Sequence, residues 1–185
     1  MLFIYTVVIF GNAADHSLAK TITKTLSQFG NTIFSGHGRI SISISENNPV
    51  PLFFICETDT LQYVDTQNAV IILKENIEGT IADWDNIDLA AIISSDNDSG
   101  LIQLANHNIN VITCGMSGKD TITISSKSEG VTMISIQRII HRLDGGIVEP
   151  MEIPVRSGNL STYQILALCA LFCVMGMEES FFWIN

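Results

Sequence analysis

The chain begins with a near-continuous apolar run, Leu2–Phe10, which is followed by a short loop and then by a helical pattern. An apolar run without alternation is typical of a strand that is covered on both faces, as strands are in parallel sheets. Asp15 or Ser17 is expected to cap the helix, which would run to Phe29 before Gly30 ends it. This opening unit predicts a parallel α/β sheet.

The rest of the chain continues the alternation of strands and helices. The strictly alternating stretch Arg39–Ser45 predicts an edge or half-exposed strand. Apolar, β-branched runs predict further strands at Leu52–Glu57, Ala69–Leu73, Leu89–Ser94 and Asn110–Cys114. Asp98 is expected to cap a helix from Ser99 to about His107. A capping box at Ser161 opens a final helix, which Gly176 closes. An antiparallel meander is predicted over Thr121–Ser125, Thr132–Ile140 and Ile147–Val155. The predicted fold class is α/β, a mainly parallel sheet flanked by helices, with a small antiparallel meander near the C-terminus.

Composition bounds the domain organisation and the partners. The chain has 185 residues and is 46% hydrophobic but only 15% charged, against roughly 25% charged residues in an average soluble domain. We expect one domain at residues 1–177 and an apolar tail at residues 178–185. Because so apolar a chain must cover much of its surface, and because the tail is aromatic, we expect a homodimer or a protein partner that buries the final helix or the tail.

Charge and cysteine spacing exclude several classes of function. A net charge of −10 with scattered lysines and arginines argues against a nucleic-acid partner. The apolar run Ile165–Met175 is shorter than the roughly 20 residues of a membrane span, and Leu2–Phe10 lacks the basic start of a signal peptide. The four cysteines show no metal-binding spacing. We therefore expect a cytoplasmic protein with free thiols, no membrane span and no metal site.

Several segments match one family in sequence and in order. They include the strand, loop and helix VVIFGNAADHSLAKTITKTLSQFG, the strand LFFICETDTL, the strand and hairpin VITCGMSGKDTITIS, and the helix in IPVRSGNLSTYQILALCALFCVMGM. Together they resemble the central ATPase domain of the Mur ligases, the peptidoglycan-building amide ligases, and of their folylpolyglutamate synthase relatives. The resemblance covers almost the whole chain. It implies a phosphate-loop fold and places Glu57 at the family's magnesium-binding glutamate.

The phosphate loop departs from the family pattern G-x-x-x-x-G-K-[ST]. Counting from Gly11, the second glycine falls on His16. The lysine falls on Ser17 and the hydroxyl residue falls on Leu18. The lysine of the pattern reaches the terminal phosphates and the hydroxyl holds magnesium, so both contacts are missing. Asp15 would cap the helix and repel a phosphate. The loop is therefore interpreted as the scaffold of an NTP site without its phosphate chemistry.

The leading hypothesis is a non-catalytic Mur-ligase-like binding or interaction module that does not use ATP and needs no cofactor. Two alternatives stay open. One is a minimal nucleotide- or phosphate-dependent enzyme that uses His16, Ser17 and Glu57, and the other is a subunit of an amide-ligase-like complex completed in trans. Weak binding of a nucleotide or of Mg²⁺ also stays open. No catalytic residue is predicted, because none of the four histidines has a visible acidic or nucleophilic partner.

Ligands of open α/β sheets bind at the carboxyl ends of the strands. Polar residues that follow predicted strands are therefore the candidates for a ligand pocket. They are Gly11, Asn12, Asp15, His16, Ser17, Glu57, Asp59 and Asp96.

Overall fold

The computed structural model describes residues 4–44, 51–61, 64, 66, 68–77, 89–105, 107–128, 130–156 and 158–181. Its strands and helices, in chain order, are β1 (Ile4–Phe10), α1 (Ser17–Leu26), β2 (Asn31–Gly36), β3 (Arg39–Ser43), β4 (Leu52–Thr58), β5 (Ala69–Leu73), β6 (Leu89–Ser94), α2 (Asp98–Leu104), β7 (Asn110–Cys114), β8 (Ile122–Ser128), β9 (Val131–Ile136), β10 (Ile140–His141), β11 (Ile147–Val148), β12 (Met151–Val155), α3 (Thr162–Val174) and α4 (Glu178–Phe181).

Ten strands form one sheet in the order β12-β9-β8-β7-β6-β5-β1-β4-β2-β3. Along the sheet, every neighbouring pair from β2 through β4, β1, β5, β6 and β7 to β8 is parallel. Both ends of the sheet are antiparallel, with β3 beside β2 at one end and β9 and β12 beyond β8 at the other. Strands β10 and β11 form a separate antiparallel pair. The predicted fold class is confirmed, with the meander continuing the main sheet.

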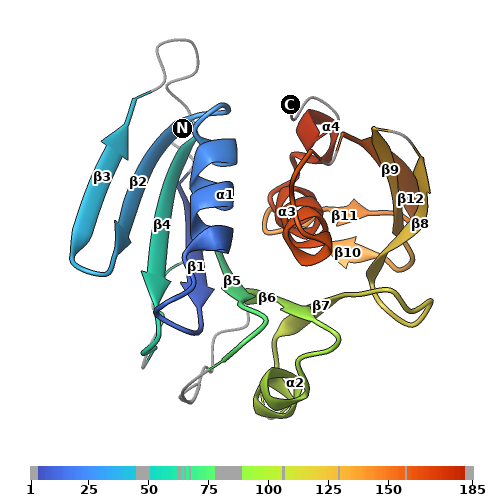
Figure 1. Cartoon of the computed structure of the whole chain (residues 1–185), viewed down its shortest axis with the longest axis horizontal. Helices are drawn as coiled ribbons and strands as arrows, with labels where there is room; N and C mark the ends of the chain where they lie inside the picture. The colour runs from blue at the N-terminus through green and yellow to red at the C-terminus, as the bar shows by residue number, and fades with distance from the viewer. Residues whose placement is uncertain are drawn as a thin grey trace.

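Helices cover both faces of the central strands. In Figure 1, α1 and α3 lie on the concave face of the curved sheet, and α2 lies on the opposite side of β6 and β7. Val7 and Ile9 of β1 belong to the core cluster that contains α1 and α3. Val8 and Phe10 of the same strand belong to the cluster that contains Leu104 of α2. Burial on both faces explains why β1 is a continuous apolar run.

Helix α3 runs through the middle of the fold. The predicted capping box is confirmed, because Ser161 Oγ accepts from the Gln164 N–H at 3.2 Å and Gln164 Oε1 accepts from the Ser161 N–H at 2.9 Å. All residues from Ile165 to Met175 are buried. The expectation that a partner buries the final helix is therefore wrong for α3, which its own chain covers. Among the described residues no helix is long and apolar enough to cross a membrane.

The described part of the tail, α4, folds back onto α3. Phe181 is 2% exposed, and its ring centroid lies 5.4 Å from that of Phe172. The tail was expected to be buried by a partner, but Phe181 is buried by its own chain, because α4 returns to the core. Residues 182–185 of the predicted tail lie outside the described residues, as do Leu2 and Ser45 at the ends of two predicted strands. The homodimer stays a prediction.

The helix ends differ from the sequence predictions. Helix α1 starts at Ser17 with His16 at its N-cap and ends at Leu26, three residues before Phe29. The cap of α2 is Asn97 and not Asp98, because Asn97 Oδ1 accepts from the Gly100 N–H at 2.9 Å. Strand β2 was not predicted at all. These differences move local boundaries and leave the order of the predicted elements unchanged.

Candidate functional site

The carboxyl ends of β1, β4 and β5 meet at one edge of the sheet. The loop after β1 begins at Gly11, Glu57 lies near the end of β4, and Lys74 directly follows β5. The parallel registers place Glu57 opposite Ile9 and place Leu73 opposite Phe10. Gly11 has a φ of +141°, and a Cβ there would lie 2.8 Å from Lys74 Cβ, so only glycine fits beside this lysine.

The Lys74 ammonium occupies the centre of the loop. Its Nζ donates hydrogen bonds to the carbonyl oxygens of Asn12 at 2.7 Å and Asp15 at 2.6 Å. It also lies 2.8 Å from Glu57 Oε1, in an ion pair whose geometry falls short of a hydrogen bond. The two charged side chains are 1% and 2% exposed. The loop thus turns carbonyl oxygens toward a cation that the protein itself supplies.

Four N–H groups of the loop between β1 and α1 have acceptors within the protein. Asn12 provides its carbonyl oxygen to the Asp15 N–H and its Oδ1 to the Ala14 N–H. The Gly11 and Asn12 N–H groups donate to the carbonyl oxygens of Thr58 and Asn76. A phosphate-binding loop needs N–H groups that point at the anion without another partner. Two of these donors instead hold the loop to the end of β4 and to the segment after β5, and the other two bond to Asn12 within the loop.

The start of α1 is held by the side chain of Asp15. Asp15 Oδ1 accepts from the Ser17 N–H at 2.9 Å, and this hydrogen bond is the main cause that lowers the pKa of the Asp15 carboxyl below its usual range. The predicted cap, Asp15 or Ser17, is wrong, because His16 is the N-cap residue and Asp15 lies one position before it. Leu18, at the position of the family's magnesium-binding hydroxyl, is buried in the core at 3% exposure.

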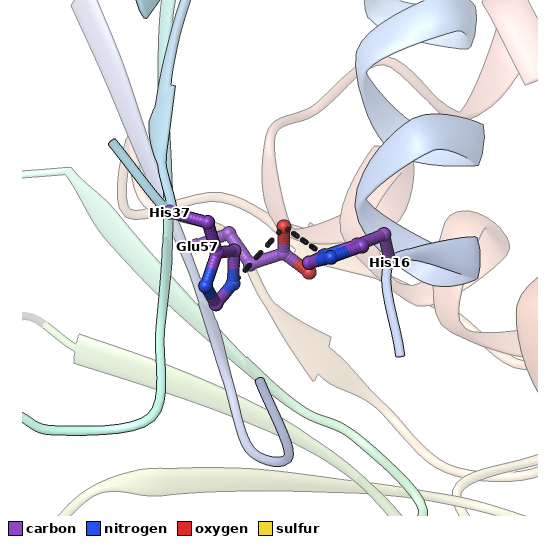
Figure 2. A group of neighbouring side chains, drawn as sticks. All are labelled: His16, His37 and Glu57. Atoms are coloured by element: carbon purple, nitrogen blue, oxygen red, sulfur yellow. Dashed lines mark hydrogen bonds and ion pairs between the residues drawn. The ribbon is translucent and has the colours of Figure 1, made fainter. Parts of the chain in front are cut away.

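Two histidines converge on Glu57, as Figure 2 shows. His16 Nδ1 lies 3.1 Å from Glu57 Oε2, and His37 Nε2 lies 3.5 Å from the same oxygen. The two rings meet edge to face with their centroids 4.6 Å apart. His37 comes from the turn between β2 and β3, where its φ is +47°. We call His16, His37 and Glu57 the imidazole–carboxylate cluster.

A groove opens onto this cluster between α1 and the strands β2 and β3. It has a volume of about 680 Å³, with His16, His37 and Glu57 in its lining. Lys20, Lys24 and Arg39 also line it, although the chain has only nine lysines and arginines and a net charge of −10. Positive charges that are scattered in the sequence therefore gather along one groove, where they favour an anionic ligand.

The residues predicted to form one ligand pocket lie at different sites in the structure. The loop residues and Glu57 surround Lys74. Asp96 lines another hollow, of about 430 Å³, together with Asn12, Glu75 and Asp98. Asp59 is exposed and accepts a hydrogen bond from the Thr60 hydroxyl at 3.1 Å. The structure therefore does not bring Asp59 or Asp96 into the groove lining.

Sequence reasoning missed the roles of Lys74 and His37. The charged residue directly after the apolar strand Ala69–Leu73 was the available signal for Lys74, because the end of a central strand lies near the site edge. The partners of His37 are set by the unpredicted strand β2, and no local pattern reveals them. The histidines were expected to have no acidic partner, and for His16 and His37 this expectation is wrong.

Solved structures share the fold. A murein peptide ligase from Psychrobacter arcticus matches with a TM-score of 0.53 and 8% identity, over 98% of this chain and 47% of that chain. The fold is Mur-ligase-like. Two other structures match with TM-scores of 0.49 at 10% identity. One is a UDP-N-acetylmuramoyl-L-alanyl-D-glutamate–2,6-diaminopimelate ligase, over 96% of this chain and 43% of that chain. The other is the UDP-N-acetylmuramate:L-alanyl-γ-D-glutamyl-meso-diaminopimelate ligase from Neisseria meningitides, over 100% of this chain and 66% of that chain.

This Mur-ligase-like chain spans between 43% and 66% of the length of those structures. No family model matches its sequence, and no curated protein matches it. At such low identities the likeness concerns the fold alone.

Proposed function

We propose that this chain is a Mur-ligase-like module that binds a ligand or partner and does not use ATP. The observation that carries the proposal is the position of Lys74. Its ammonium lies where two loop carbonyls converge, between Asn12 O and Asp15 O, and it is paired with buried Glu57. A triphosphate bound in the usual way would have to displace these contacts.

The energetic argument follows from burial. Separating a buried ion pair costs about 3–5 kcal/mol, which corresponds to at least a hundredfold loss of affinity for whatever displaces it. Phosphoryl transfer also needs a magnesium ion held beside the phosphates and a lysine that reaches them. Ser17 and Leu18 stand at the two pattern positions that supply these contacts, and Leu18 is buried. Together these features favour a structural role for the loop over a role in nucleotide binding.

The groove is the proposed binding surface. Lys20 and Lys24 are exposed on α1, and Arg39 is exposed on β3. All three line the groove. An anionic group entering there would meet these side chains in a protein that is otherwise strongly negative. We propose a small anionic ligand, bound in a reducing compartment such as the cytoplasm, as the four free cysteines suggest.

The test is a calorimetric titration of the protein with MgATP, with an assay for released phosphate on the same samples. The proposal predicts no saturable heat in the micromolar range and no turnover. Saturable micromolar binding accompanied by hydrolysis would contradict it and would favour the minimal enzyme.

A further inference from the structure

We propose that the imidazole–carboxylate cluster binds a divalent first-row transition-metal ion such as Zn²⁺, through His16 Nδ1, His37 Nε2 and Glu57 Oε2. These three atoms all lie within 4.8 Å of one another. The site is distinct in chemistry from a magnesium site, because magnesium is held by oxygen atoms and these ligands include two imidazoles.

The distances fit one shared ion. Zinc forms bonds of about 2.0–2.2 Å to imidazole nitrogen and carboxylate oxygen, so two ligand atoms around a tetrahedral ion lie about 3.3–3.5 Å apart. The measured separations from Glu57 Oε2 are 3.1 Å to His16 Nδ1 and 3.5 Å to His37 Nε2. The two imidazole nitrogens lie within 4.8 Å of each other, so the two rings would approach each other to share one ion with Glu57 Oε2.

The carboxylate is already oriented for one-oxygen binding. Lys74 lies beside Oε1, whereas both histidines face Oε2. A partner on the second oxygen of a ligating carboxylate fixes its direction, as outer contacts do in metal sites. Because Lys74 also offsets the charge of Glu57, the cluster has little net attraction for a hard cation. Affinity has to come from the imidazole nitrogens, which suit zinc, cobalt, nickel and copper.

Access and open coordination positions are provided by the groove. The side chains of His16 and His37 are 39% and 29% exposed, while that of Glu57 is 2% exposed. The carboxylate therefore anchors the ion from inside and the histidines reach it from the groove side. Three protein ligands leave a fourth position for water or a bound ligand, which is the arrangement of open zinc sites.

This inference does not depend on how the loop treats ATP, and its test contains no nucleotide, so one proposal can fail without the other. Co²⁺ is titrated into the metal-free full chain and followed by its visible absorption, and Zn²⁺ affinity is measured by competition with a chromophoric chelator. One ion per chain and tetrahedral-type Co²⁺ bands are expected. Excess Mg²⁺ is expected to leave the bound Co²⁺ in place.

The variants are His16→Asn and His37→Asn, since asparagine tolerates the positive φ of residue 37. Each is expected to weaken Zn²⁺ binding by about 10- to 100-fold or more. The matched control is His141→Asn, an exposed histidine on β10, which is expected to bind as the unmodified protein does. No binding by the unmodified protein, equal binding by all variants, or displacement of Co²⁺ by Mg²⁺ would each overturn the proposal. Far-ultraviolet circular dichroism confirms that each variant is folded.

Discussion

Replacing Lys74 with methionine should strongly destabilise the protein. Methionine has a similar length and no charge, so the change keeps volume and removes the ammonium. It leaves Glu57 buried without its cation and removes the Lys74 donor from the carbonyl oxygens of Asn12 and Asp15. Removing one partner of a buried ion pair costs about 3–5 kcal/mol. Because His16 and His37 still face Glu57 Oε2, we expect a loss near the lower end, about 3 kcal/mol.

The assay is urea unfolding followed by circular dichroism, with the free energy of unfolding obtained for each variant. Lys119→Met is the matched control, because Lys119 is exposed and such changes usually stay within about 0.5 kcal/mol. The double variant Lys74→Met/Glu57→Gln should regain at least half of the loss, since it no longer buries a lone charge. A Lys74 variant as stable as the Lys119 control, or a double variant no more stable than Lys74→Met, would refute the reasoning.

Three further predictions follow from the same structure. Because the pKa of Asp15 is lowered, its contribution to stability is present above the ordinary aspartate pKa and is lost as the pH falls through the folded-state value. The difference in melting temperature between the wild-type protein and Asp15→Ala should therefore be large at pH 7 and shrink below about pH 4. A difference that does not change with pH would count against this prediction. Burial raises the pKa of the Cys114 thiol, and a hydrogen bond with Cys173 together with burial raises the pKa of the Cys169 thiol. Mass spectrometry after brief alkylation should therefore find both unmodified until the protein is unfolded, and rapid labelling of the folded protein would contradict their burial. Ile40 and Ile42 are 73% and 67% exposed on the edge strand β3, and exposed apolar edges favour association. Light scattering should show a dimer that the double variant Ile40→Ser/Ile42→Ser converts to a monomer. Equal masses for the wild-type protein and the double variant would exclude this face as the interface.

The central strands could be predicted from the sequence because burial on both faces leaves an unmistakable apolar run. Strands β5 and β6 are buried at every position, and the predicted bounds match the structure. Strand β2 could not be found in this way, because NTIFSG mixes polar and apolar residues in a half-buried position. The cap of α2 was misplaced by one residue because Asn97 and Asp98 carry equally suitable side chains.

The candidate site was only partly predictable. Its location at the carboxyl ends of the strands follows from general rules of α/β sheets. Its contacts do not, because His16 and Glu57 are 41 positions apart and Lys74 is 62 positions from Asn12. Those contacts depend on β1 lying between β4 and β5 and on β2 lying beside β4, an order that local sequence patterns do not specify.

The central claim is that the loop between β1 and α1 is closed to phosphate by its own hydrogen bonds and by Lys74. It is tested most directly by an NMR titration of ¹⁵N-labelled protein with MgATP, which follows the backbone amides of the loop one by one. We predict that the amide signals of Gly11, Asn12, Asp15 and Ser17 keep their positions throughout, because these N–H groups already donate within the protein. Saturable shifts of these amides, together with a displaced Lys74 side-chain signal, would contradict the claim.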